Sequence, residues 1–133
     1  MANTLGEFQV FLHESNDAAG RHRTQFNFWR GLLKVAERTV TDNKLTKLKY
    51  LQDNVAKYGV ACTNVETGIG ALQNKLAQEF PSDPEAELRS APIENRAFLE
   101  ESNNLVNQIR GNLELAVQRE DEMKDFGLPA VPC

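Results

Sequence analysis

Three stretches of the chain repeat apolar residues at alternating spacings of three and four, and this pattern constrains the fold more than any other feature. Such a heptad repeat lays one apolar stripe along a helix, and the stripe must be buried against those of other helices. The stretches cover residues 4–40, 43–80 and 84–126. The pattern predicts an all-α protein, an elongated antiparallel bundle of three helical arms with coiled-coil-like heptad packing. The first stripe consists of Leu5, Phe8, Leu12, Ala19, Phe26, Trp29, Leu33, Ala36 and Val40.

The second and third arms carry stripes of the same kind. Residues 59–70 are poor in helix-forming side chains, but the apolar repeat continues through them, so we expect one unbroken second helix. Pro92 should interrupt the third arm after a short helix from Pro84 to Arg89. The second stripe consists of Leu48, Leu51, Val55, Tyr58, Cys62, Val65, Ile69, Leu72 and Leu76. The third consists of Leu88, Leu99, Val106, Ile109, Leu113, Ala116 and Met123.

Short connections at 41–43 and 82–85, both rich in turn and capping residues, should make neighbouring arms antiparallel. If the chain folds back at these points, facing residue numbers sum to about 84 across the first turn and to about 164 across the second. The predicted layers are Phe8–Leu76–Leu88, Ala19–Val65–Leu99, Phe26–Tyr58–Val106, Trp29–Val55–Ile109, Leu33–Leu51–Leu113 and Ala36–Leu48–Ala116.

Charge is distributed unevenly along the chain. Residues 21–57 hold nine Lys or Arg and three acids, whereas residues 66–126 hold thirteen acids and six bases. The net charge of −4 and the isoelectric point near 5.2 do not favour nucleic acid as a partner. Antiparallel pairing predicts that the lysines of the second arm lie beside acids of the third. These residues are Lys44, Lys47 and Lys49, and Glu114, Glu120, Asp121 and Glu122.

One predicted layer is polar and consists of His22, Cys62 and Ser102. An imidazole beside a thiol is the beginning of a nucleophile–base pair, so a Cys-His enzyme or redox sensor is one reading. A small polar layer also fixes the register of a bundle, and a closed core gives a substrate no cleft. We therefore predict a structural layer, with no catalytic residue, cofactor, metal site or small-molecule substrate.

The tripeptide Trp29-Arg30-Gly31 resembles the Trp-x-Gly motif of small secreted helical-hairpin proteins. In that family the motif lies in the turn between two helices, whereas here it lies inside an arm, so we assign no family. The three arms also resemble spectrin-like repeats, in architecture alone. A secreted or phage-derived helical effector or chaperone remains an alternative function.

The ends of the sequence carry expectations of their own. No apolar run approaches the ~18 residues of a membrane span, and the first residues lack the features of a signal peptide, so a cytoplasmic or intracellular location is expected. Residues 1–127 should form one domain. The tail, residues 128–133, holds two prolines and Cys133 and is expected to be flexible.

The leading functional hypothesis is a non-catalytic helical interaction protein, a small subunit or adaptor of a larger assembly whose partner is another protein. Phe28 and Tyr50 lie outside the apolar stripes, and exposed aromatic side chains are enriched at interfaces. Phe28 should be exposed in the isolated chain, with Arg30 beside it. The predicted partner-binding residues are therefore Phe28, Arg30 and Tyr50.

Overall fold

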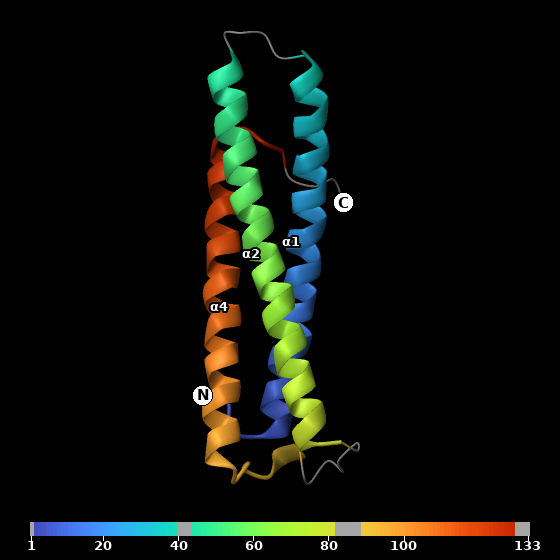
Figure 1. The fold of residues 1–133 in the computed structure, drawn as a ribbon, viewed down its shortest axis with the longest axis vertical. Coiled ribbons are helices and arrows are strands. Elements are labelled where there is room, and N and C mark those ends of the chain that lie inside the picture. Colours follow the sequence, from blue (N-terminus) through green and yellow to red (C-terminus); the bar gives the residue numbers. More distant parts are fainter. Residues whose placement is uncertain (1, 40–43, 82–88, 130–133) are drawn as a thin grey trace.

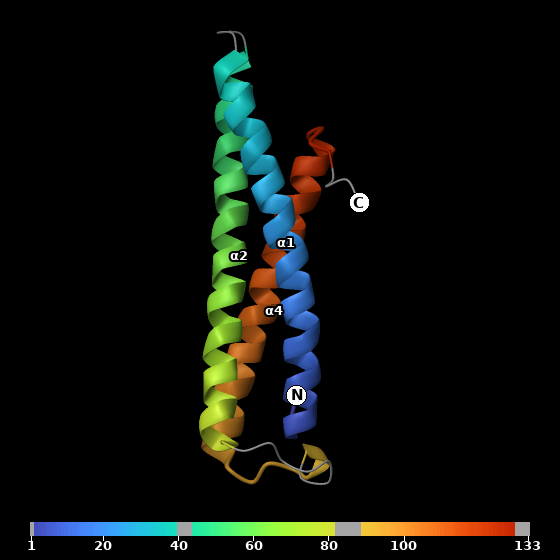
Figure 2. The ribbon, with the colours of Figure 1, turned by 90° about the vertical axis from the view of Figure 1, so that its right-hand side faces the viewer.

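A computed structural model describes residues 2–39, 44–81 and 89–129. Its helices, labelled as in Figure 1, are α1 (Leu5–Thr39), α2 (Leu45–Glu79) and α4 (Arg96–Asp125). They run alongside one another and form the predicted all-α three-helix bundle (Figures 1 and 2). The predicted turns, Val40, Leu88 and the helix proposed from Pro84 lie outside the described residues, apart from Arg89, which is helical.

The helix ends follow from local capping chemistry. The Thr4 hydroxyl accepts a hydrogen bond from the Glu7 backbone N–H (3.2 Å) at the start of α1. At the start of α4, the Asn95 side chain accepts one from the Phe98 N–H (3.2 Å). After α4, Gly127 adopts a φ of 107°, a conformation that favours glycine, and the Leu128 N–H reaches back to the Met123 carbonyl (2.9 Å). This Schellman turn directs the chain back toward α1.

Helix α2 is the shared element of the bundle, and it continues unbroken through residues 59–70 as predicted. It packs along both α1 and α4, whereas α1 and α4 make few direct contacts. A Cβ atom added at Gly59 would lie 2.5 Å from the Phe26 ring of α1. One added at Gly68 would lie 2.8 Å from Ile109 Cγ1 of α4. These two glycines therefore permit close approach of a neighbour on either side of α2.

The buried apolar side chains form two clusters along the bundle. The base cluster, at the end of the α2–α4 connection, consists of Leu5, Phe8, Leu12, Ala19, Val65, Ile69, Leu72, Leu76, Phe98, Val106 and Ile109. The upper cluster consists of Trp29, Leu33, Leu48, Leu51, Val55, Tyr58, Ala61, Cys62, Ala116 and Met123.

The predicted register between α1 and α2 is confirmed. The Phe26 and Tyr58 rings are in contact, with centroids 6.4 Å apart. Trp29 and Val55 share the upper cluster, and Ala19 and Val65 share the base cluster.

The predicted register between α2 and α4 is wrong. The helix ends beside the second turn, Glu79 and Arg96, sum to 175 rather than about 164, and the ion pair between Lys75 and Glu101 follows the same rule. The shift is about three helical turns. Its cause is the late start of α4. The helix begins at Arg96, directly after the capping residue Asn95 and twelve residues beyond the predicted start of the third arm at residue 84. Ile109 consequently lies in the base cluster, away from Trp29 and Val55 in the upper one.

The non-helical segment before α4 is attached to the N-terminal residues at the base of the bundle. Thr4 and Pro92 form an isolated antiparallel bridge, and the Ile93 N–H donates to the Asn3 carbonyl (2.8 Å). The buried Asn103 side chain donates to the Ala2 carbonyl (2.8 Å) and accepts from the Ala2 N–H (3.1 Å). These contacts hold residues 92–95 out of the helix and fix where α4 begins.

The start of the predicted flexible tail is docked on the bundle. The Trp29 indole Nε1–H donates to the Pro129 carbonyl (2.7 Å), and Leu128 packs against the upper cluster. In Figure 1 the chain crosses from the end of α4 to α1 here. Residues 130–133, including Cys133, lie outside the described residues.

The observed register can be tested by crosslinking. Val60 and Leu115 are exposed and line the same depression between α2 and α4. Leu51 and Leu113 would face each other in the predicted register, but in the observed one they should lie roughly 16 Å apart along the bundle. In a Cys62→Val/Cys133→Ser background, Val60→Cys/Leu115→Cys should react with a short bismaleimide within one chain. Leu51→Cys/Leu113→Cys should not. Efficient internal crosslinking of the second pair instead would restore the predicted register.

The glycines of α2 give a second test. Gly68→Ala should lower the free energy of unfolding by about 1–3 kcal/mol, because its Cβ would collide with the fully buried Ile109. Gly70→Ala, two residues further on, meets open space and should raise it by about 0.5–1 kcal/mol. Urea denaturation of both variants measures the difference. Equal effects of the two substitutions would show that α4 does not approach α2 at Gly68.

Candidate functional site

The three predicted partner-binding residues have different surroundings. The prediction that Phe28 is exposed is wrong, because Phe28 is half-buried and packs against the upper cluster. Leu32, one turn further along α1, and Leu128 of the docked tail pack against the same cluster, so this side of α1 is partly covered. Arg30 is exposed and lies over the Phe26 ring, 5.6 Å from its centroid.

Tyr50 is exposed on α2, as its place outside the apolar stripe indicated. Its ring lies against Phe126, just beyond α4, with centroids 4.7 Å apart. Lys47, which is also on α2, lies over the Phe126 ring, with its Nζ atom 5.3 Å from the ring centroid. The structure therefore does not join Phe28, Arg30 and Tyr50 in one surface.

The predicted polar layer of His22, Cys62 and Ser102 is wrong for the same reason as the second register. Ser102 is fully buried, but the shift places it roughly 16 Å along the bundle from the level of His22. Cys62 is buried in the upper cluster. His22 has other partners, which the sequence did not indicate.

His22 meets one polar side chain from each of the other helices. Its Nδ1 atom lies 2.7 Å from the Tyr58 hydroxyl of α2 and 3.4 Å from a carboxylate oxygen of Glu120 of α4. Tyr58 is fully buried, and its ring also packs edge-on against Trp29, with centroids 5.3 Å apart. The side chains of His22 and Glu120 are 11% and 19% exposed, so this cluster lies just beneath the surface.

Burial sets the protonation of the His22 cluster. It lowers the pKa of His22 below the ordinary value of 6.5, against the opposing effect of the Glu120 carboxylate. It also raises the pKa of Tyr58, and the charge of Glu120 acts in the same direction. At neutral pH a protonated Tyr58 hydroxyl can therefore donate to Nδ1 of a neutral imidazole, which satisfies both groups.

Cys62 is poorly suited to nucleophilic chemistry. Burial raises the pKa of its thiol to about 11, so the reactive thiolate is scarce at neutral pH. The nearest charged groups, Arg23 and Glu66, pair with each other in an ion pair between α1 and α2. Among the described residues, no group of three or more His, Cys, Asp or Glu side chains could hold a metal ion.

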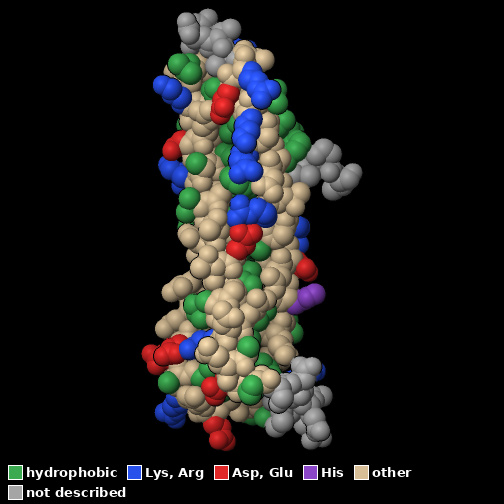
Figure 3. All heavy atoms as spheres, turned by 45° about the vertical axis from the view of Figure 1, so that its right-hand side comes forward, with side chains coloured by type: hydrophobic (Ala, Val, Ile, Leu, Met, Phe, Trp, Pro, Cys, Tyr) green, Lys and Arg blue, Asp and Glu red, His purple; other side chains and the backbone are tan. Residues whose placement is uncertain are grey.

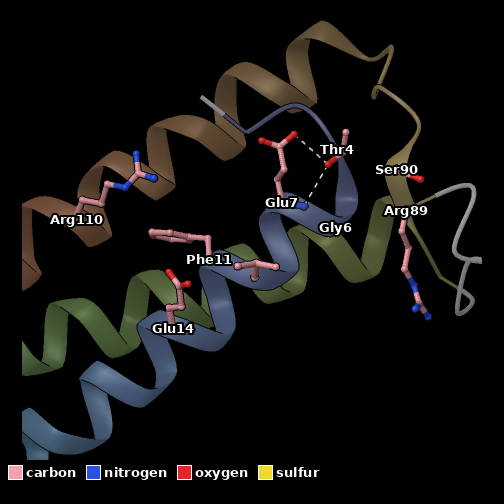
Figure 4. Close-up of a pocket in the computed structure, with 9 residues that line it drawn as sticks. Thr4, Gly6, Glu7, Phe11, Glu14, Arg89, Ser90 and Arg110 are labelled. Atoms are coloured by element: carbon pink, nitrogen blue, oxygen red, sulfur yellow. Dashed lines mark hydrogen bonds between the residues drawn. The ribbon is translucent and has the colours of Figure 1, made fainter.

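A groove of about 540 Å³ opens between α1 and α4, which make few direct contacts, close to the base (Figure 4). Val10, 59% exposed, and Phe11 supply its apolar part. The Arg110 guanidinium reaches from α4 over the Phe11 ring, 5.2 Å from the centroid, as Figure 4 shows. We call this surface the α1–α4 groove. Its lining residues are Thr4, Gly6, Glu7, Val10, Phe11, Glu14, Arg89, Ser90 and Arg110.

The two rims of the α1–α4 groove carry opposite charge. Glu7 and Glu14 project from α1 and Arg110 reaches over from α4, whereas Arg89 lies beyond Gly6 with its side chain pointing away from these three (Figure 4). Among the described residues none of these four side chains forms an ion pair, although Glu7 accepts a hydrogen bond from the Thr4 hydroxyl (3.1 Å) and Arg110 lies over the Phe11 ring. The apolar pattern of the sequence does not indicate this surface, because its existence depends on α1 and α4 diverging.

Comparison of the chain with protein-family models, with curated proteins and with solved structures finds no match. None of the described helices is long and apolar enough to cross a membrane. Function must therefore be inferred from the surfaces themselves.

The His22 cluster predicts a pH-dependent stability. Because the pKa of His22 is lower in the folded chain than in the unfolded chain, the unfolded chain takes up more protons as the pH falls below about 6.5. The free energy of unfolding therefore decreases as the pH falls through this range. Between about pH 7.5 and about pH 5.5, the wild type should lose more unfolding free energy than His22→Gln, which cannot titrate. Parallel losses in urea denaturation would mean that His22 charges as easily in the folded as in the unfolded chain.

Proposed function

We propose that the protein is a non-catalytic helical interaction protein, a small subunit or adaptor that binds one helix of a protein partner along the α1–α4 groove. The observation that carries this proposal is the groove itself, an apolar floor between two rims of opposite charge. A helix laid between α1 and α4 would bury Val10 and Phe11 and cover the side of α1 that makes few contacts with α4.

The charges define the partner helix. It should present an apolar stripe, with basic residues on the side that meets Glu7 and Glu14 and an acidic residue on the side that meets Arg110. Opposite rims favour one direction of the partner helix, because reversing it end for end exchanges the sides and places like charges together. The groove thus supports orientation as well as affinity.

The chemistry of the core supports a binding role over a catalytic one. The Cys62 thiol is buried with a raised pKa, and the His22 imidazole is engaged by Tyr58. An enzyme would need an accessible nucleophile or base beside a substrate cleft. The groove instead offers apolar and charged side chains suited to a helix.

The proposal is tested with two matched variants. Val10 and Val60 are 59% and 60% exposed, and both lie within helices, but only Val10 lines the α1–α4 groove. Val10→Arg should weaken capture of the partner protein about tenfold or more, because it places a charge on the apolar floor. Val60→Arg should leave capture unchanged, and both should melt close to the wild type.

Affinity purification with each variant, read by quantitative mass spectrometry, gives the measurement. A partner that is retained by Val60→Arg and lost by Val10→Arg supports the proposal. Loss from both variants, or from neither, would place the partner elsewhere on the molecule.

A further inference from the structure

The end of the bundle opposite the groove carries a second surface. Helix α4 ends short of the α1–α2 hairpin, which continues alone to its turn (Figures 1 and 2). The ring contact between Phe126 and Tyr50 shows how far α4 reaches along α2. The first five residues of α2, which precede Tyr50, and the corresponding end of α1 therefore have no third helix beside them.

This hairpin end is strongly basic. Five exposed cations and one exposed acid, Glu37, lie on it, and none of the cations forms an ion pair with any residue that the structure describes. Figure 3 shows Lys and Arg side chains gathered in a column over the upper half of one face. We call this surface the basic tip. Its residues are Lys34 and Arg38 of α1, and Lys44, Lys47 and Lys49 at the start of α2.

The lysine–acid pairs predicted between the second and third arms are absent from the described structure. The register shift separates them, so that Lys47 meets the Phe126 ring and Glu120 meets His22 and Lys124. The acids of the last α4 turns remain level with Tyr50 or further back. They lie roughly 9 Å behind Lys44, which is about one Debye length at physiological salt. The described residues of the basic tip therefore carry a net positive charge.

Apolar side chains are exposed among these cations. Val35 is 62% exposed beside Lys34, and Leu45 is 40% exposed beside Lys44. Lys34 and Arg38 are four residues apart and so share one face of α1, whereas the cations of α2 point to different sides of that helix, with Val35 and Leu45 exposed among them.

We propose that the basic tip binds the surface of an anionic lipid bilayer, with the bundle standing end-on. A flat anionic surface approached by the tip can engage cations from both helices at once, and Val35 and Leu45 can enter the boundary between headgroups and acyl chains. A nucleic-acid backbone would meet only one side of the hairpin and would have no use for the apolar groups. No described helix can span the bilayer, so the attachment is peripheral.

This surface is independent of the α1–α4 groove. The groove lies near the base, at the other end of the bundle (Figures 1 and 4). A bilayer-bound molecule would therefore hold the groove away from the membrane.

Vesicle sedimentation tests the proposal with two double variants that remove the same charge. Lys34→Gln/Arg38→Gln removes two cations from the basic tip, and Arg21→Gln/Arg96→Gln removes two exposed, unpaired cations from elsewhere. Wild type should bind vesicles of phosphatidylcholine with about a third phosphatidylserine, and not vesicles of phosphatidylcholine alone. Each cation near the surface contributes about fivefold, so the tip variant should bind about 25-fold more weakly, and the other variant close to normally.

Further measurements distinguish a lipid bilayer from nucleic acid and from a second copy of the chain. Val35→Ser/Leu45→Ser should weaken vesicle binding while leaving any binding to duplex DNA unchanged, and high salt should release the wild type from vesicles. Equal losses from the two charge variants, binding to uncharged vesicles, or no vesicle binding by the wild type would overturn the proposal. Tighter binding of the wild type to duplex DNA than to anionic vesicles would overturn it in favour of nucleic acid. Salt-dependent self-association that the tip variant abolishes, without vesicle binding, would instead identify a second copy as the occupant.

Discussion

The bundle depends on the ability of α2 to bury two of its sides at once. Twelve residues of α2 are buried, against eight of α1 and seven of α4, because α2 alone has a neighbour on each side. Gly59 and Gly68 make this geometry possible by admitting Phe26 from α1 and Ile109 from α4. Each glycine lowers helix stability by about 1 kcal/mol relative to alanine. Complete burial of a side chain such as Ile109 returns about 1.5–3 kcal/mol. Tertiary packing thus offsets the weak helix propensity of residues 59–70.

The same apolar pattern explains which part of the fold could be predicted. A heptad stripe fixes the side of a helix that faces its neighbours, so the three helices and the register of α1 on α2 could be derived from it. It does not fix sliding along the axis by whole turns, because a shift of about eleven residues, or three turns, returns a similar side to the core. What decides the second register is the start of α4. That start depends on the Asn95 cap and on backbone contacts of residues 92 and 93 with the N-terminal segment, which periodicity does not report.

The candidate site was predictable only to the extent that it did not depend on the second register. His22 belongs to a polar cluster, as its position in the stripe indicated, but its partner on α4 is Glu120 rather than Ser102. The sequence does contain a pattern that indicates how the chain leaves α4. Gly127 followed by Leu128 and Pro129 is typical of a Schellman turn at a helix end, and this turn directs Leu128 and Pro129 toward α1. The two prolines of residues 128–133 favour a flexible tail when they are considered without this turn. The hydrogen bond from Trp29 to Pro129 joins residues a hundred positions apart, and no local pattern reports it.

The free charge at the basic tip is a consequence of that same register. Had α4 begun twelve residues earlier, its acids would have faced Lys44, Lys47 and Lys49 and cancelled them. With the observed register, the acids fall behind Tyr50, and the α1–α2 hairpin extends alone with like charges close together. Such repulsion destabilises the isolated chain slightly and stabilises nothing within it. An anionic surface that collects these cations would convert this internal cost into binding energy. The position of one helix start thus links the packing at the base of the bundle to the charge exposed at its opposite end.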